Sequence, residues 1–257
     1  MDLPILMYHA VEAGEPSGYG YAVSAEQFGG QLDAIKRAGF ETISLSQLFH
    51  GLEGRARLPR KPIVLTFDDA YRNVHETAWP MMRERGMKGV LFVVADHVGG
   101  TNEWDQAKGM PKLDLMDAAE LKEMASAGWE IGSHGCRHLE LGKAGDSEQR
   151  DEVFRSRSQL ASLLGVAADF YAYPYGSCTE SSKRLVAEAG YRGAVSIFST
   201  AASVTGDRFW MRRIMPHRGD SALSFRLKLS PLYLRYVAWR DSRKQEAKRP
   251  KDERLKD

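Results

Sequence analysis

The chain has 257 residues, which is enough to bury one large α/β core of barrel size. Its composition, 43% hydrophobic and 27% charged, is ordinary for a globular protein, and a formal net charge of +2 is too small to indicate a nucleic-acid partner. The two cysteines, Cys136 and Cys178, exclude a disulfide framework. They read as small buried side chains, with the alternative that one packs beneath a metal site.

Short apolar runs alternate with amphipathic stretches along the chain, a pattern typical of βα units and a parallel sheet. We predict strands at 5–8, 63–67, 89–95, 129–133, 170–173 and 194–198. We predict helices at 25–38, 74–85, 118–127, 147–164 and 180–189, each followed by a glycine suited to a helix C-cap. This repeated order favours an α/β fold, a distorted (β/α) barrel that occupies residues 1–220.

Two long loops, 12–21 and 98–113, interrupt this order, and loops of such length usually carry function or disorder. In the second loop, Asn102, Trp104 and Asp105 suit a rim that faces the substrate. No run reaches the ~20 apolar residues that span a bilayer. The N-terminus lacks the basic and apolar regions of a signal peptide, so we expect residence in the cytoplasm.

From residue 221 to residue 257 the chain is basic and amphipathic, with aromatic and leucine side chains interleaved with lysine and arginine. Such a segment is typical of an element that lies at a membrane interface. The alternative is a helix packed on the barrel, followed by a solvated tail. Peripheral contact with the inner membrane face would favour a lipid-linked saccharide as substrate.

Polar side chains follow four of the predicted strands at the point where each strand ends. In a parallel barrel, functional groups gather at the carboxyl ends of the strands. The residues at these four points are His9, then Asp68 and Asp69, then His134 and His138, and finally Tyr173, Pro174, Tyr175 and Gly176.

Two imidazoles with one carboxylate, and a second carboxylate left over, are the composition of a hydrolytic metal site. Adjacent residues of an extended segment point to opposite sides, so one of Asp68 and Asp69 should bind metal while the other addresses the attacking water. Taken singly, an Asp-Asp pair is most often a turn or helix cap and a His-x-x-x-His pair is most often solvated surface. His50, His75 and His97 have no matching context and read as surface or capping groups.

At these residues the chain resembles the polysaccharide deacetylases, the NodB-homology group of carbohydrate esterases. The matching segments are Thr66-Phe67-Asp68-Asp69, Ser133-His134-Gly135-Cys136-Arg137-His138 and Tyr173-Pro174-Tyr175-Gly176. The resemblance covers most of residues 3–216. It implies that Asp68 is the general base and that Asp69, His134 and His138 hold a divalent ion, usually zinc, with cobalt, nickel and manganese as alternatives.

The family also uses a histidine as general acid, commonly in a late Leu-x-His motif that this chain lacks. Leu6-Met7-Tyr8-His9 fits this role, and it resembles the circularly permuted subgroup that deacetylates poly-N-acetylglucosamine, in which the first strand replaces the last. We therefore assign the acid to His9, with His217 as the alternative.

A second departure concerns the arginine that braces the catalytic acid, which is missing before Tyr173. Arg213 is our choice for that role and Arg212 is the alternative. The remaining alternative is that neither arginine serves this role and both are exposed to solvent. Trp210 lies close by in the sequence and suits a wall of the acetyl pocket. Tyr173, Pro174 and Tyr175 are expected to contact the substrate, and the resemblance implies that the backbone N–H of Tyr175 stabilises the oxyanion.

The resemblance implies metal-dependent removal of an N-acetyl group from an amino sugar in a polysaccharide, an oligosaccharide or a lipid-linked glycan precursor. Asp68 would take a proton from water and His9 would protonate the departing amine. Two alternatives are a hydrolase of a small amide or cyclic imide, as in allantoinase-like relatives, and a catalytically silent glycan-binding module. The intact Asp68-Asp69 motif and filled ligand positions favour the deacetylase.

Overall fold

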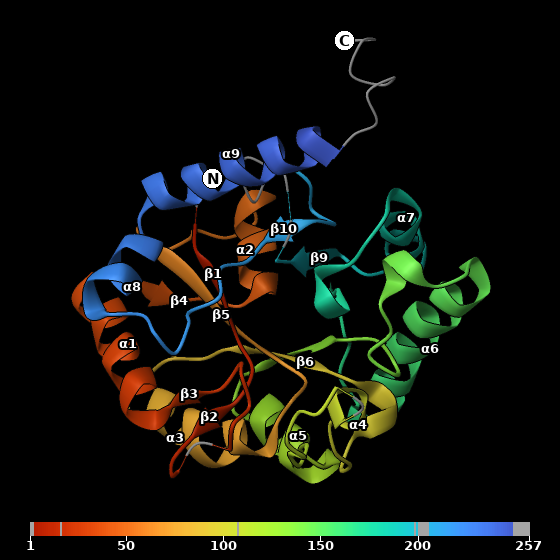
Figure 1. The fold of residues 1–257 in the computed structure, drawn as a ribbon, viewed down its shortest axis with the longest axis horizontal. Helices are drawn as coiled ribbons and strands as arrows, with labels where there is room; N and C mark the ends of the chain where they lie inside the picture. The colour runs from red at the N-terminus through yellow and green to blue at the C-terminus, as the bar shows by residue number, and fades with distance from the viewer. Residues whose placement is uncertain (1–2, 16, 107, 198, 200–205, 249–257) are drawn as a thin grey trace.

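The computed structural model describes residues 3–15, 17–106, 108–197, 199 and 206–248. Within this part of the chain, eight parallel strands form the main sheet (Figure 1). Seven follow the order β1 (Ile5–Tyr8), β5 (Pro62–Asp68), β6 (Val90–Val93), β7 (Glu130–Ser133), β8 (Phe170–Ala172), β9 (Gly193–Ser196) and β10 (Met211–Arg212). The eighth, β4 (Glu41–Thr42), pairs with β5. A separate two-stranded sheet joins β2 (Val11–Glu12) and β3 (Val23–Ser24).

The main sheet returns to its first strand through the residues that follow β10. Ile214 bridges Leu6 in parallel register. The amide of Met7 donates to the Ile214 carbonyl at 2.9 Å, and the amide of Ile214 donates to the Ile5 carbonyl at 2.8 Å. These bonds nearly close the sheet into a barrel, which confirms the predicted α/β barrel.

Helices surround the strands, as Figure 1 shows. They are α1 (Ala25–Arg37), α2 (Leu45–Leu52), α3 (Trp79–Arg83), α4 (Glu103–Gln106), α5 (Ala118–Ser126), α6 (Asp146–Leu164), α7 (Glu180–Glu188), α8 (Ala222–Lys228) and α9 (Pro231–Lys248). Short 3-10 turns lie at Ala95–His97, Leu141–Lys143 and Pro174–Gly176. Side-chain caps begin several helices: Ser24 caps α1, Asp117 caps α5 and Thr179 caps α7.

The helix predicted at 74–85 is instead two pieces. A π-helical turn, Val74–Ala78, precedes α3, and its bond runs from the Trp79 amide to the Val74 carbonyl. The next residue is Pro80, which has no N–H to donate back to the preceding turn. The helix therefore changes type next to the position where a regular α-helix would lack the N–H donor of residue 80.

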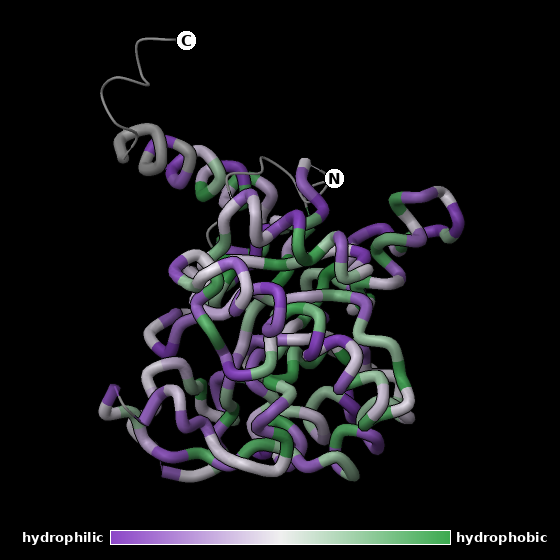
Figure 2. Tube along the Cα trace, turned by 90° about the vertical axis from the view of Figure 1, so that its right-hand side faces the viewer, coloured by the Kyte–Doolittle hydropathy of each residue, from purple (hydrophilic) through white to green (hydrophobic). Residues whose placement is uncertain are grey.

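Alternation along each strand divides the core into two layers. Inside the barrel, Ile5, Val64, Phe92, Phe170 and Met211 form one cluster, which α2 extends with Leu45, Leu48 and Phe49. The intervening side chains, among them Leu6, Leu65 and Leu91, pack outward against the helices. In Figure 2, hydrophobic segments, in green, occur in the middle of the molecule and also toward its edges.

The two last helices pack on the barrel. Phe225 of α8 and Leu229, which follows it, are buried in the outer cluster. Further along, Asp241 of α9 forms an ion pair with Arg212 of β10. The described part of the basic segment is therefore attached to the barrel, while the boundary between residues 220 and 221 stays a prediction.

Candidate functional site

Along each strand, every second side chain faces the inside of the barrel. These inward side chains are apolar along most of the strand and become polar at its carboxyl end, where they form the site. The inward face of β5 carries Val64, Thr66 and Asp68, so this row of side chains ends in a carboxylate. The row of Ile5 continues to His9 in the same way, and the row of Met211 continues to Arg213. Strand periodicity thus brings an acid, an imidazole and a guanidinium together at one end of the barrel.

The two adjacent acids diverge because the chain turns sharply between them. Asp68 is the last residue of β5, whereas Asp69 and Ala70 adopt left-handed conformations with φ of 68° and 56°. Non-glycine residues rarely adopt such values, and they concentrate at functional sites. This turn gives Asp68 and Asp69 different partners.

Asp68 forms a bidentate ion pair with Arg213. Its Oδ1 accepts from Nη1 at 2.6 Å and its Oδ2 accepts from Nη2 at 2.7 Å, and both residues are buried. Burial alone would raise the pKa of Asp68, but the charge of Arg213, followed by that of His134, outweighs burial and holds this pKa well below its usual range. Asp68 is therefore kept as a carboxylate.

Asp69, His134 and His138 form a group whose ligand atoms all lie within 4.8 Å of one another. The Asp69 Oδ1 atom lies 3.6 Å from His134 Nε2 and 3.3 Å from His138 Nε2. The Nδ1 of His134 lies 2.8 Å from the Ala172 carbonyl, which fixes the ring so that its Nε2 faces Asp69. All three residues are buried.

The electrostatics of this group fit a bound cation. Asp69 Oδ1 is buried without a hydrogen-bond partner among the described residues, which is costly for a carboxylate oxygen. Burial raises the pKa of Asp69 to about 6 and lowers the pKa of His138 to about 4. One carboxylate and two neutral imidazoles at this spacing are a donor set suited to Zn²⁺ and similar ions.

Glu152 of α6 orders the loop that carries the two histidines, a feature that the sequence did not reveal. Its Oε1 accepts from the amides of Cys136 at 2.9 Å, Arg137 at 2.6 Å and Leu139 at 3.3 Å. Its side chain is fully buried, and Oε2 lies 3.2 Å from Arg137 Nε. His138 itself has φ of 59°. The loop conformation therefore depends on a carboxylate outside the metal group.

A cavity of about 80 Å³ connects these groups. Burial lowers the pKa of His9 despite the opposing charges of Asp68 and Asp69, and the His9 ring stacks on Tyr21 at 5.1 Å. The lining includes His9, Asp68, Asp69, His134, His138 and Arg213, together with Tyr19, Tyr21, Asp105, Tyr173 and Tyr175.

The loop at 98–113 contributes a rim to this cavity. Asp105 lines it and accepts from the Tyr19 hydroxyl at 3.2 Å. Trp104 stacks on His138 with ring centroids 4.7 Å apart. Lys108 donates to the Tyr175 hydroxyl at 2.6 Å and lies 3.4 Å from Asp105. Asn102 bonds within the loop instead, to the Leu113 amide and the Pro111 carbonyl.

Besides Asn102, Trp104 and Pro174, three further residues considered from the sequence lie outside the cavity lining. His217 is exposed, and its amide donates to Asp220. Arg212 pairs with Asp241. Trp210 packs on the cluster around Tyr171 and Tyr173, with Lys183 Nζ 5.0 Å from its ring.

Both cysteines are free thiols, and burial raises the pKa of each to about 12. Such thiols are unreactive.

Sequence comparisons match this chain to known proteins. The model of the polysaccharide deacetylase family matches residues 55–194. Over 223 residues the chain is 25% identical to the Bacillus subtilis (strain 168) protein YxkH, covering 87% of this chain and 74% of that protein. Over 204 residues it is 24% identical to the poly-β-1,6-N-acetyl-D-glucosamine N-deacetylase of Staphylococcus aureus (strain MSSA476), covering 76% and 68%.

Solved structures share the fold. The Streptococcus pyogenes deacetylase PplD, in complex with acetate, superposes with a TM-score of 0.77 at 22% identity and covers 90% of this chain and 99% of its own. IcaB from Ammonifex degensii superposes with a TM-score of 0.71 at 23% identity and covers 91% and 97%.

Proposed function

This chain belongs to the polysaccharide deacetylase family, whose members hydrolyse carbon–nitrogen bonds of N-acetylated sugars, and we propose that it is a metal-dependent N-deacetylase that uses Asp68 and His9 as its base and acid. The buried, bidentate pair of Asp68 and Arg213 beside the Asp69–His134–His138 group is the observation that carries this proposal.

Asp69, His134 and His138 would hold the metal ion. A divalent ion there supplies Lewis-acid chemistry, polarising an amide carbonyl and lowering the pKa of water. The chain's own contribution is a rigid donor set: Ala172 fixes the His134 ring and Glu152 fixes the loop of His138. Zinc suits these donors, and cobalt, nickel and manganese are the alternatives.

Asp68 acts as the general base. Arg213 keeps it ionised, so it accepts a proton from the attacking water when the substrate is bound. His9 lies across the same cavity, at the end of β1, and protonates the nitrogen that leaves as the carbon–nitrogen bond breaks. The products are acetate and a free amino sugar. We propose that the backbone N–H of Tyr175, which lies in a left-handed turn with φ of 58°, donates to the developing oxyanion.

The substrate we propose is an N-acetylated amino sugar within a polysaccharide, an oligosaccharide or a lipid-linked glycan. Support comes from the relative named as a poly-β-1,6-N-acetyl-D-glucosamine N-deacetylase. Aromatic rings of Tyr19, Tyr21 and Tyr175 around the cavity supply the apolar surfaces on which sugar rings pack. Tyr173 lines the same cavity, whereas Pro174, the next residue, lies outside its lining.

Acetate release from N-acetylhexosamine oligomers tests this proposal. We expect Asp68→Asn and His9→Asn each to lose about 10²- to 10⁴-fold in rate, as removal of a general base or acid does. His217→Asn is the matched control, since its side chain is exposed outside the cavity, and it should keep the wild-type rate. Release that persists in Asp68→Asn, or vanishes in His217→Asn, would overturn the assignment.

We further propose that the protein resides in the cytoplasm and contacts the inner membrane face peripherally. Within the described residues, no helix has the length and apolar character to cross a bilayer. Support for surface contact comes from α8 and α9, which expose large apolar side chains beside arginines. Sedimentation of the protein with membranes from lysed cells, at low and high salt, tests this: we expect the sedimented fraction to fall with salt, and a fully soluble protein at low salt would overturn it.

A further inference from the structure

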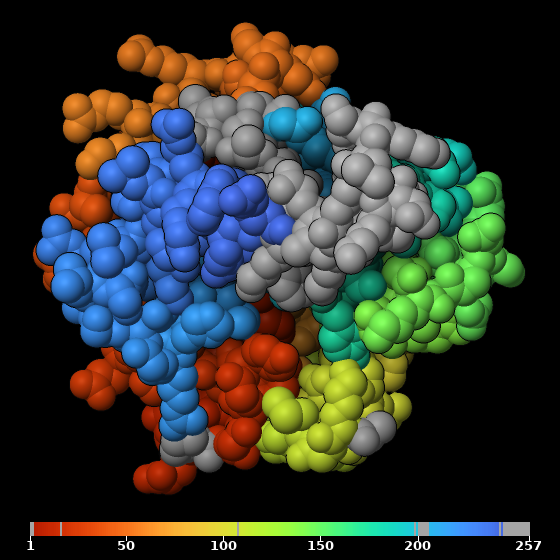
Figure 3. Space-filling view, turned by 45° about the horizontal axis from the view of Figure 1, so that its top comes forward, coloured from red at the N-terminus to blue at the C-terminus, as the bar shows by residue number. Residues whose placement is uncertain are grey.

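The outer faces of α8 and α9 carry five large apolar side chains that are more than half exposed. They are Leu223, Leu227, Leu232, Tyr236 and Trp239, each between 53% and 79% exposed. We call these five the α8–α9 face. Figure 3 shows both helices, in blue, on the surface of the molecule.

The spacing makes this face continuous on each helix. Leu223 and Leu227 are four residues apart on α8, and Leu232, Tyr236 and Trp239 follow at intervals of four and three on α9. The opposite side of α9, with Val237 and Ala238, is the side that packs on the barrel. A helix with one apolar side already buried thus presents a second one outward.

The charge around this face is positive. In residues 221–248, arginine and lysine outnumber aspartate and glutamate by seven to two. Arg235 is exposed on α9, and the Arg243 guanidinium lies 5.8 Å from the Trp239 ring. Leucine, tryptophan and tyrosine interleaved with arginine are the composition of a surface that meets anionic lipid.

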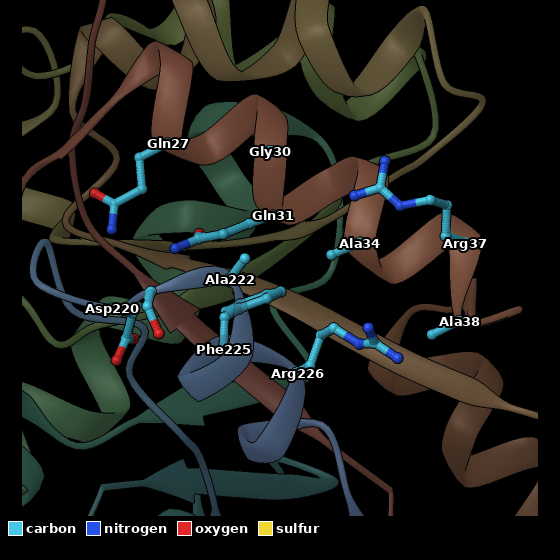
Figure 4. Close-up of a pocket in the computed structure, with 11 residues that line it drawn as sticks. Gln27, Gly30, Gln31, Ala34, Arg37, Ala38, Asp220, Ala222, Phe225 and Arg226 are labelled. Atoms are coloured by element: carbon cyan, nitrogen blue, oxygen red, sulfur yellow. The ribbon is translucent and has the colours of Figure 1, made fainter.

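A groove of about 580 Å³ lies between α1 and α8, beside this face (Figure 4). The side chain of Gln31 is buried and its Nε2 has no hydrogen-bond partner among the described residues, because only its Oε1 is engaged, by the Tyr8 hydroxyl. Figure 4 shows this amide directed into the space between the two helices. A buried N–H without a partner is available to donate a hydrogen bond to an acceptor atom of a ligand.

Two arginines flank the same groove. Arg37 of α1 and Arg226 of α8 both line it, and neither forms an ion pair with a described carboxylate. The carboxylate in the groove is Asp220, which is already neutralised by Lys228 at 2.6 Å and accepts from the His217 amide. The two guanidinium groups therefore line the groove without an ion-pair partner among the described residues, although Arg37 lies near enough to Asp33 to lower the pKa of that carboxyl.

The positive rim continues beyond this groove. A second groove of about 420 Å³ shares Ala38 and Arg226 with the first and adds Arg60 and Lys61. Arg226 lies one residue from Leu227 on α8, so the cationic rim directly adjoins the apolar face. Apolar contact and phosphate-binding charge occur side by side, as an amphiphile with an anionic headgroup requires.

We propose that the groove between α1 and α8 binds the phosphate of an anionic phospholipid through Arg37, Arg226 and Gln31, while the α8–α9 face rests on the bilayer. This rests on the membrane contact proposed above and not on the deacetylation chemistry. The N-terminal ends of β1 and β5, at Pro4 and Pro62, line the second groove with α9's first residue, Pro231. The catalytic cavity, at the carboxyl ends of the same strands, therefore opens away from the lipid.

Vesicle co-sedimentation tests the proposal, with phosphatidylcholine vesicles that contain or lack phosphatidylglycerol. We expect wild type to sediment with the anionic vesicles alone. Arg37→Gln with Arg226→Gln should weaken this binding about tenfold to thirtyfold. Arg83→Gln with Lys122→Gln, two exposed cations on α3 and α5, removes the same charge elsewhere and should change it less than about twofold.

Further arms separate the remaining possibilities. Leu223→Ser with Leu227→Ser should abolish sedimentation while both grooves stay intact. Equal losses in the two charge variants, or wild-type binding to inorganic phosphate in solution without binding to vesicles, would each overturn a lipid-phosphate site. Acetate release from a soluble oligomer should be unchanged in Arg37→Gln with Arg226→Gln, so a failure of this site is distinguishable from a failure of the deacetylase proposal.

Discussion

Asp68 and Asp69 are adjacent in the chain, but their pKa values shift in opposite directions. Asp68 has its pKa held low by Arg213 against the effect of burial, whereas burial raises the pKa of Asp69 to about 6. Divergent pKa values in paired acids commonly mark divided roles at catalytic sites. The sequence indicated a division of roles between the two residues, but the left-handed turn at Asp69 is what gives each its partner.

The first prediction concerns Arg213. Replacing it with lysine keeps the charge but removes the planar fork that bonds both oxygens of Asp68. We expect acetate release to fall about 10- to 100-fold, which corresponds to a lost charged hydrogen bond of roughly 1.5–3 kcal/mol. Arg212→Lys is the control and should keep its activity, because that side chain pairs with Asp241 outside the cavity. Equal activities of the two variants would contradict the role given to Arg213.

The second prediction concerns Glu152, a positioning residue. In Glu152→Gln, a neutral side-chain amide replaces the carboxylate that accepts hydrogen bonds from the backbone N–H groups of Cys136 and Arg137. The loop that carries His138 should therefore become less ordered. We expect metal affinity, measured by competition with a chromogenic chelator, to fall about 10- to 100-fold. Glu188→Gln, an exposed acid on α7, should leave it unchanged. An unchanged affinity in Glu152→Gln, with its fold intact, would show that the loop orders without this carboxylate.

At the scale of elements, an ion pair joins α6 to the turn after β6. Arg155 lies 2.6 Å from Asp96, and this hydrogen bond, more than any other contact, lowers the pKa of Asp96. Stabilisation by a depressed carboxyl pKa is present above the unfolded value of about 3.9 and is lost as pH falls through the folded value. We expect Asp96→Asn to cost about 1 kcal/mol at neutral pH, since the pair is partly exposed.

Urea unfolding of wild type and Asp96→Asn at neutral pH and near pH 3 measures this difference. The stability gap should narrow at the acidic end, because the unfolded carboxyl binds a proton below about 3.9, whereas the folded one does so only at its lowered pKa. A stability gap that stays constant across the range would mean that the pair acts by packing and not by charge.

The long elements were predictable because their periodicity is strong, and the short ones were not. The predicted strands at 5–8 and 129–133 lie within one residue of β1 and β7. Strands of two residues, such as β4 and β10, are too short to show alternation, and α2 and α4 were missed. The same limit applies to the site: strand-end residues could be found by parity, whereas Glu152 and Lys108 act through contacts that only the folded chain creates.

At the scale of the whole molecule, metal binding should be measurable as stability. The unpaired Asp69 oxygen makes the metal-free site costly, and an ion that binds the folded state alone stabilises it. Saturation at about 100 times the dissociation constant adds roughly 2.7 kcal/mol, which corresponds to a rise in Tm of about 5–10 °C. We expect zinc addition after chelation to produce this rise in wild type and no rise in Asp69→Asn. A wild-type Tm that ignores the metal would contradict a site at Asp69.

The closure of the barrel at Ile214 also determines when, during synthesis, the molecule becomes complete. β1 is synthesised before the strands that pair with it, but one edge of β1 has no partner until Ile214 is made, more than 200 residues later. Asp68 likewise has no ion pair until Arg213 is made. A nascent chain thus carries an unpaired strand edge and an unneutralised carboxylate until Arg213 and Ile214 have been synthesised. Protease resistance of stalled chains should appear in one late step, once the residues after β10 have left the exit tunnel.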